Sequence, residues 1–215
     1  MSDGRILSGG EIPGTTRDST DTLIYREKKA FSLVDTAGIR KLSRTRDNRE
    51  KASIIKAKKD IGRADVICMI MDAQEFPTRQ DSAIAHLSRE SGKPMIIALN
   101  KWDLIQKDTR TSEDYKRKCY TKLDFVNYAP FFSVSALSGK RVIKILDFAE
   151  QVYANGKKRV ETSQLNNFLT WINANCPPLS RKKRRIKIKY MTQKNILPPT
   201  FILFTHSRVS LAPSR

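Results

Sequence analysis

Histidine and cysteine are scarce in this chain, with two and three copies among 215 residues. The cysteines, Cys68, Cys119 and Cys176, are far apart, so they predict neither a disulfide framework nor a zinc site. Long apolar runs are also missing, since the longest, residues 66–71, has the length of a strand and not of a membrane-spanning helix. No apolar segment near Met1 has the length of a signal peptide. We therefore expect a cytoplasmic protein that is not inserted in a membrane.

Acidic residues are in short supply too, with 22 Asp and Glu against 41 Lys and Arg, a net charge of +19. The imbalance is concentrated in residues 157–215, which hold 13 basic residues and one acidic residue, Glu161. A block this basic is typical of a segment with a polyanionic partner, which could be RNA, DNA or a membrane surface. The alternative is a solvated tail without a partner.

Short apolar runs alternate with helix-like segments in the first part of the chain. The runs are continuous, as expected for parallel strands covered on both faces, and comprise residues 31–34, 65–71, 94–99 and 131–134. Helical patterns lie at residues 49–62, 80–90 and 142–153, the second with a C-cap at Ser91-Gly92. This alternation predicts an α/β fold with a doubly wound sheet.

A polar break at residues 155–159 precedes a different pattern. A helix is predicted from about Thr162 to Cys176, with one apolar face made of Leu165, Phe168, Leu169 and Ile172. A half-buried strand is predicted at residues 184–192, where Ile186, Ile188 and Tyr190 alternate with cationic side chains, and a second strand at 200–205. We expect an α/β domain and a small basic α+β domain, at residues 1–156 and 157–215.

Polar motifs follow three of the predicted strands directly. They are Asp35-Thr36-Ala37-Gly38, Asn100-Lys101-Trp102-Asp103 and Ser135-Ala136-Leu137. Because the carboxyl ends of parallel strands meet at one edge of the sheet, where such sheets bind ligands, we expect the motifs to lie together. Asp35 suits Mg²⁺ held through water, and Gly38 leaves room for a backbone N–H to approach a terminal phosphate.

The second motif has the chemistry to select guanine. The carboxylate of Asp103 accepts two N–H groups in one plane, which adenine does not offer. Asn100 braces the loop, the stem of Lys101 lies along the ring, and the turn at Ser135-Ala136 presents N–H groups to the base carbonyl. A fourth motif, residues 13–18, places a threonine hydroxyl where it can ligate Mg²⁺; the alternative is an ordinary polar loop.

In this order the motifs resemble those of the translation-factor-related GTPases, and most closely the Der (EngA) family. The resemblance covers residues 11–205 and matches that family's second GTPase domain followed by its C-terminal KH-like domain. It implies a P-loop GTPase fold, binding of GTP and GDP with Mg²⁺ and K⁺, and GTP hydrolysis. It also implies a role in ribosome biogenesis on the large subunit, with ribosomal RNA as partner, in a monomeric protein.

The resemblance assigns roles to single residues. Thr16, in preference to Thr15, and Asp35 would hold Mg²⁺, and Thr16 and Gly38 would act in catalysis, Gly38 at the γ-phosphate. Ile39 stands where many GTPases have a water-positioning glutamine, which implies slow hydrolysis. The nucleotide would contact Asp35, Thr36, Ala37, Gly38, Ile39, Asn100, Lys101, Trp102, Asp103, Ser135 and Ala136.

The phosphate-binding loop G-x-x-x-x-G-K-[ST] is missing from these 215 residues. Loss of four charge-assisted hydrogen bonds to the phosphates would cost about 6–12 kcal/mol. We therefore expect a fragment without GTP turnover of its own; the alternatives are a non-catalytic RNA- or ribosome-binding adaptor and an unrelated phosphate-binding α/β protein.

The strand before that loop is missing as well. In the family's sheet we expect it between the strands at residues 31–34 and 94–99, so both should have an unpaired edge. Residues 206–215 do not resemble the last helix of a KH-like domain, which predicts a C-terminally incomplete module.

Overall fold

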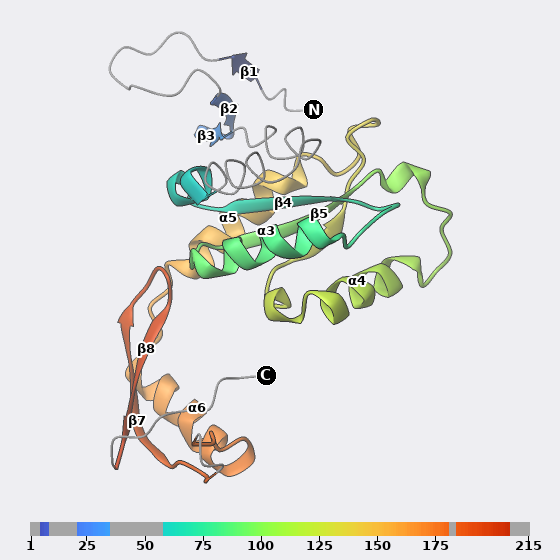
Figure 1. Ribbon diagram of the computed structural model, residues 1–215. Helices are drawn as coiled ribbons and strands as arrows, with labels where there is room; N and C mark the ends of the chain where they lie inside the picture. The colour runs from blue at the N-terminus through green and yellow to red at the C-terminus, as the bar shows by residue number, and fades with distance from the viewer. Residues whose placement is uncertain (1–4, 9–20, 35–57, 181–183, 207–215) are drawn as a thin grey trace, which may run out of the picture. The chain divides into compact units, whose positions relative to one another are not determined.

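The computed structural model describes residues 5–8, 21–34, 58–180 and 184–206 (Figure 1). The chain forms two compact units, residues 1–64 and 65–215. Among the described residues, none of the helices combines the length and the hydropathy needed to span a membrane.

The first unit contains a three-stranded antiparallel sheet in the order β1-β2-β3. Its strands are β1 (Arg5–Ser8), β2 (Thr22–Arg26) and β3 (Lys29–Leu33). The two-residue turn between β2 and β3, Glu27-Lys28, has positive φ at both positions, as a tight hairpin turn requires. The strand predicted at 31–34 is therefore present, but the expectation of a parallel strand covered on both faces is wrong, because β3 is mostly exposed and pairs antiparallel with β2.

The helix predicted at residues 49–62 is described only in part. Residues 58–63 are helical, and the rest of that range lies outside the described residues. Arg63, at the end of this helix, forms a 2.6 Å ion pair with the buried Asp21, just before β2.

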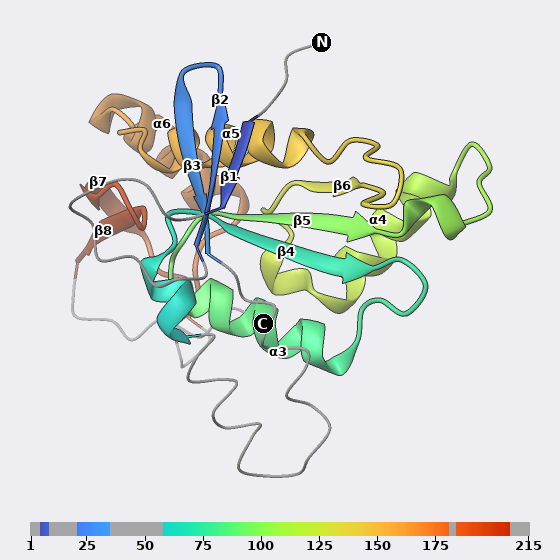
Figure 2. The ribbon, with the colours of Figure 1, turned by 90° about the horizontal axis from the view of Figure 1, so that it is seen from above.

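The second unit is built on a parallel sheet in the order β4-β5-β6. Its strands are β4 (Ile67–Asp72), β5 (Met95–Asn100) and β6 (Phe131–Ser133). Helix α5 (Lys144–Gly156) lies against one face, and α3 (Arg79–Glu90) and α4 (Thr111–Lys122) lie against the other (Figure 2). The central strand β5 is buried along its apolar residues, so the predicted α/β fold with a parallel sheet is confirmed.

Two details of the predicted sheet are wrong. β5 pairs with β4 on one side and β6 on the other, so residues 94–99 have no unpaired edge; among the described strands of this sheet the edges are β4 and β6. The reason is that parallel strands joined by a crossover helix usually lie side by side in the sheet. β4 also alternates in burial, with Cys68 and Ile70 exposed, although its sequence is apolar throughout.

Helix α3 begins and ends as its sequence indicates. The hydroxyl of Thr78 accepts the N–H of Asp81 (3.1 Å), and the Asp81 carboxylate accepts the N–H of Thr78 (2.8 Å), which is a capping box. Ser91 caps the other end, and Gly92 follows with φ +67°, a conformation that favours glycine.

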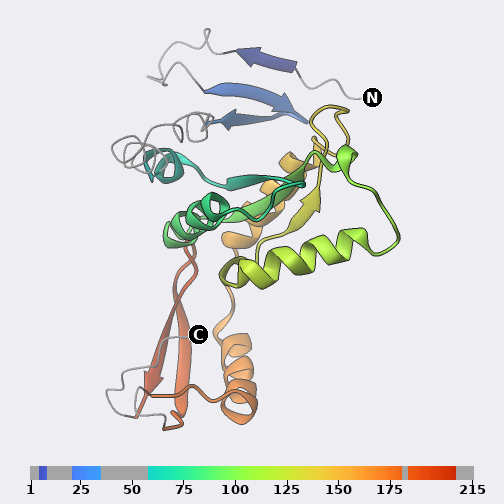
Figure 3. The ribbon, with the colours of Figure 1, turned by 45° about the vertical axis from the view of Figure 1, so that its right-hand side comes forward.

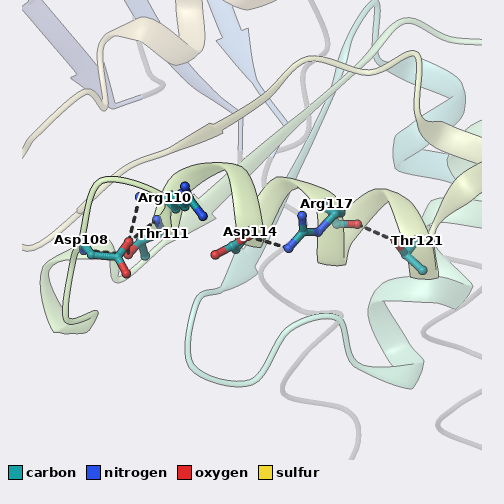
Figure 4. Close-up of polar contacts among 6 residues, drawn as sticks. All are labelled: Asp108, Arg110, Thr111, Asp114, Arg117 and Thr121. Atoms are coloured by element: carbon teal, nitrogen blue, oxygen red, sulfur yellow. Dashed lines mark hydrogen bonds and ion pairs between the residues drawn. The ribbon is translucent and has the colours of Figure 1, made fainter.

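Helix α4 was not predicted, because its sequence is largely polar. Its start is held by the Asp108 carboxylate, which accepts the N–H groups of Arg110 (2.8 Å) and Thr111 (2.7 Å). The Thr111 hydroxyl also donates to this carboxylate. That hydrogen bond, followed by the two from the backbone, lowers the pKa of Asp108. Figure 4 shows this start and two further contacts along the helix, an Asp114–Arg117 ion pair of 2.7 Å and a hydrogen bond from the Thr121 hydroxyl to the Arg117 carbonyl. Two short 3₁₀ helices, η2 (Trp102–Leu104) and η3 (Asp124–Val126), flank it.

The C-terminal part of this unit is a helix beside a hairpin (Figure 3). The elements are α6 (Thr162–Asn175), β7 (Ile188–Asn195) and β8 (Thr200–Thr205), with β7 and β8 antiparallel. The helix and the second strand were predicted with these limits to within a residue or two. The small core consists of Leu165, Leu169, Ile188 and Met191.

Two side chains of this module lie elsewhere than predicted. Tyr190 is exposed, because a register shift between Ile188 and Tyr190 changes the face and puts Met191 into the core instead. Phe168 is also exposed and stacks on Trp171, with ring centroids 6.0 Å apart.

A buried glutamine ties the module to the segment that follows α5. The side-chain oxygen of Gln193 accepts the N–H of Val160 (2.8 Å), and its amide group donates to the carbonyl of Asn195 (3.2 Å). Only 4% of Gln193 is exposed. Since a buried amide is costly unless it is hydrogen-bonded, these contacts fix the chain at this point.

The turn of the hairpin rests on two glycines of the α/β part. A Cβ on Gly92 would lie 2.8 Å from the Cβ of Pro198, and one on Gly156 would lie 3.0 Å from a methyl group of Leu197. A side chain on Gly92 would therefore require Pro198 to move, whereas one on Gly156 would require only a small shift of the flexible Leu197 side chain. We call these two glycines the hairpin seat. Because Gly92 precedes β5, the seat lies at the amino end of the sheet.

Candidate nucleotide-base site

The candidate site begins where β5 ends. Asn100 is the last residue of the strand, Lys101 follows in the left-handed conformation (φ 62°), and the short helix η2 begins at Trp102. The N–H of Trp102 donates to the carbonyl of Val134 (3.1 Å). The turn after β5 is therefore fastened to the chain just beyond β6, its neighbour in the sheet.

Asn100 makes the second link between these two strand ends. Its side-chain oxygen accepts the backbone N–H of Ala136 (2.9 Å). The predicted motifs at 100–103 and 135–137 thus lie together, as the rule for parallel strand ends led us to expect.

Asp103 and Ser135 make the third link. The hydroxyl of Ser135 donates to the Asp103 carboxylate, which together with the backbone N–H of Asp103 and the charge of Lys107 lowers the pKa of Asp103. Ser135 also accepts the N–H of Ser138 (3.2 Å), which orients its hydroxyl. The carboxylate therefore stays ionised at neutral pH and acts only as a hydrogen-bond acceptor.

A cavity of about 290 Å³ opens between the two loops. It combines one carboxylate with several cations and small hydroxyls, and its lining residues are Trp102, Asp103, Lys107, Ser133, Val134, Ser135, Ser138, Lys140 and Arg141. Polar groups that converge on a concave surface are typical of a site for a small ligand. A planar heterocycle with N–H donors matches the acceptor at Asp103.

The side chain of Lys101 has a partner at the end of the neighbouring strand. Its ammonium lies 2.5 Å from a carboxylate oxygen of Asp72, the last residue of β4. This ion pair fixes the end of the side chain, and the expected contact of its stem with the base ring stays a prediction.

The remaining predicted site residues lie outside the described residues. They are Thr16, Asp35, Thr36, Ala37, Gly38 and Ile39, together with Thr15. The Mg²⁺ site and the contacts to the terminal phosphate therefore stay predictions from sequence.

Sequence reasoning missed two polar groups at this edge. Asp72 follows the apolar run of β4 in the same way that Asp35 follows its own strand, so the strand-end rule could have found it. Arg141 donates to the hydroxyl of Ser133 (2.9 Å) and lines the cavity, but the sequence around it carries no recognisable signal.

Two family descriptions match the chain. Residues 4–101 match the family described as 50S ribosome-binding GTPase. Residues 159–214 match the KH-domain-like of EngA bacterial GTPase enzymes, C-terminal. The matches follow each other in the same order as the two parts expected from the sequence.

Curated relatives match nearly the whole chain. GTPase Der of Acetivibrio thermocellus is 45% identical over 197 residues, which are 92% of this chain and 45% of that protein. GTPase Der of Halothermothrix orenii is 43% identical over 197 residues, again 92% of this chain and 45% of the relative. The chain thus spans a little under half the length of the relatives that it matches.

Solved structures show a weaker likeness. A putative nucleolar GTP-binding protein 1 from Plasmodium falciparum has a TM-score of 0.47 and 22% identity, over 72% of this chain and 78% of that chain. Era from Aquifex aeolicus has a TM-score of 0.45 and 17% identity, over 73% and 56%. The sequence relationships carry the assignment: this chain is a homologue of the GTPase Der family, with part of a P-loop GTPase fold followed by a KH-like domain.

Proposed function

We propose that this chain carries the guanine-recognition part of a Der-like GTPase that binds and hydrolyses GTP and acts in assembly of the large ribosomal subunit. The observation that carries the proposal is the pair of loops held together by Asn100, Ala136, Asp103 and Ser135. These contacts leave the ionised carboxylate of Asp103 at the mouth of the cavity. Guanine offers two N–H groups that this carboxylate accepts, whereas adenine does not.

The other parts of the proposed function rest on the family resemblance. Thr16 and Asp35 would hold Mg²⁺, Gly38 would contact the γ-phosphate, and K⁺ would assist hydrolysis. Bound Mg²⁺ would stabilise the charge that develops on the transferred phosphoryl group. The family match described as 50S ribosome-binding GTPase supports the large subunit as the partner. We further propose a cytoplasmic monomer with its domain boundary between residues 156 and 157.

The test of base recognition is a change of ligand preference. Asp103→Asn places an amide where the carboxylate was, so the site offers a donor that suits the second carbonyl of xanthine and loses the acceptor that suits guanine. We expect the 215-residue chain to bind guanosine with millimolar affinity and the variant to prefer xanthosine, both measured by NMR titration. Asp124→Asn is the matched control, because Asp124 is exposed and lies in η3. Equal binding of guanosine and adenosine by the unmodified chain would reject the proposal.

These 215 residues by themselves should not turn over GTP, because the phosphate-binding loop is absent from them. A release assay for inorganic phosphate with Mg²⁺ and K⁺ tests this expectation. Sustained turnover by a purified, folded sample would contradict it.

A second candidate function is a non-catalytic adaptor that binds RNA or the ribosome. The observation in its favour is a row of exposed cations before and within β7, namely Arg184, Arg185, Lys187 and Lys189. Phosphates of RNA would bind such a row, and the affinity would fall steeply with salt because counterions are released on binding.

The adaptor function is tested by binding of ribosomal RNA at several salt concentrations. Alanine at Arg184, Arg185 and Lys187 should weaken binding and flatten the salt dependence. Alanine at Lys116, Lys118 and Lys122 of α4 removes the same charge from another surface and is the control. A salt-independent affinity would count against this function.

A further inference from the structure

An ion pair joins the ends of two neighbouring strands beside the base-recognition turn. The ammonium of Lys101 lies 2.5 Å from a carboxylate oxygen of Asp72. Asp72 ends β4 and lies opposite Asn100, which ends β5, in parallel register. The ion pair therefore reaches across the sheet to the residue that immediately follows Asn100.

The carboxylate of Asp72 is more firmly held than a typical surface carboxylate. Its other oxygen accepts the backbone N–H of Gln74 (3.0 Å), and the N–H of Ala73 donates to the carbonyl of Asn100 (2.9 Å). Only 13% of the Asp72 side chain is exposed, against 50% for Lys101. Exposed ion pairs contribute little because two mobile side chains must be ordered, but here one partner is ordered already.

Lys101 occupies the strained position of the turn. Its φ of 62° and ψ of 32° lie in the left-handed region, which is unfavourable for a residue that has a Cβ. Its neighbours carry the links to the loop after β6, since Asn100 accepts from Ala136 and Asp103 accepts from Ser135. If the backbone of Lys101 relaxed, both neighbouring side chains would change direction.

We propose that Asp72 is a positioning residue for base recognition, which holds Lys101 and so keeps the turn of residues 100–103 in the shape that receives guanine. Asp72 does not line the cavity, so it acts through Lys101 and not on the base. The inference rests on the proposed function, because it takes the turn to be a guanine site.

The experiment compares Asp72→Asn with Asp65→Asn in the full 215-residue chain. Asp65 is exposed and precedes the same strand at its other end, so the two variants lose the same charge from opposite ends of β4. Guanosine is the probe, titrated by NMR. We expect Asp72→Asn to weaken guanosine binding five- to twentyfold and Asp65→Asn to change it less than twofold, and thermal unfolding shows whether each variant is folded.

A double-mutant cycle separates positioning from a general structural role. If Asp72 acts through Lys101, then Asp72→Asn should weaken binding little further in a chain that already carries Lys101→Met. Asp72→Glu, which keeps the charge, should recover part of the affinity. Lys101→Met alone also covers the case in which Asp72→Asn fails to fold, because it removes the same ion pair.

The outcomes separate a failure of the proposed function from a failure of this inference alone. No guanosine binding by the unmodified chain would overturn the proposed function and this inference with it. Normal guanosine binding by the unmodified chain together with unchanged binding by Asp72→Asn or by Lys101→Met would overturn the inference alone. Fully additive losses in the cycle would also overturn it.

Discussion

The side chain of Asn100 accepts a hydrogen bond from the backbone of Ala136, 36 residues further along the chain, at 2.9 Å. This bond joins the loop after β5 to the loop after β6. It joins the motifs at residues 100–103 and 135–137 into one surface, in which Asp103 and Ser135 form a second contact.

Asn100→Ala should weaken guanosine binding by about three- to tenfold, because one hydrogen bond that holds the loops together is lost. NMR titration measures the affinity, and the amide signal of Ala136 should shift in the variant. Asn127→Ala removes an exposed asparagine from the same unit and is the control. An unshifted Ala136 signal with unchanged affinity would contradict the role given to Asn100.

The pH dependence of guanosine binding should follow the carboxylate of Asp103. Its pKa lies below the ordinary value of 3.8, chiefly because Ser135 donates a hydrogen bond to the ionised form. Binding should therefore be constant from pH 7 to pH 5 and be lost only as the pH falls through the lowered pKa. Ser135→Ala should move this loss to higher pH; a loss of binding already near pH 6 would exclude Asp103 as the acceptor.

The hairpin seat can be tested with two glycines that share one backbone conformation. Gly92 and Gly139 have φ of +67° and +70°, but a Cβ would meet Pro198 at 2.8 Å only at Gly92 and nothing within 4 Å at Gly139. Gly139→Ala should therefore show the backbone cost alone, about 1–2 kcal/mol, whereas Gly92→Ala should in addition displace the hairpin.

Urea unfolding measures the stability of both variants, and the amide signals of Leu197 and Thr200 report on the position of the hairpin. These signals should shift in Gly92→Ala and stay in place in Gly139→Ala. Equal destabilisation with an undisturbed hairpin in both variants would mean that the contact with Pro198 has no energetic weight.

Cys119 and Cys176 should differ in their reaction with iodoacetamide at pH 8. Cys119 is fully buried, and burial, followed by the charge of Asp81, raises its pKa from 9.0 to about 12, whereas Cys176 is exposed. Mass spectrometry should find Cys176 labelled and Cys119 protected in the folded chain. Rapid labelling of Cys119 without denaturant would contradict the packing of α4.

The same thiol predicts a stability change at alkaline pH. Because the folded state holds this proton to higher pH than the unfolded state, the stabilisation is intact below pH 9 and is lost as the pH rises towards 12. Urea unfolding at pH 7.5 and pH 10 measures the difference. The variant Cys119→Val should lack this part of the pH dependence.

The elements that the sequence predicted well are those with strong local signals. Apolar runs indicated β4, β5 and β6, and Ser91-Gly92 indicated the end of α3. Helix α4 escaped prediction because its stability comes from contacts such as those of Asp108, which apolar periodicity does not register.

Burial was harder to predict than the elements themselves. Continuous apolar sequence is the same in β5, which neighbours cover on both faces, and in β4, where Ile70 is exposed. The site residues differ in the same way. Asn100 and Asp103 were found because they follow a predicted strand, which is a local signal. The ion pair of Asp72 depends on the register between two strands, which no local pattern encodes.

The two glycines under the hairpin and the turn of residues 100–103 lie at opposite ends of one strand. β5 runs from Met95, next to the seat, to Asn100 in the turn, and its apolar residues are buried without interruption. About 20 Å of stiff, fully packed backbone therefore separates the two. The contact at the hairpin and the candidate site are thus joined through a single strand that is packed on both faces.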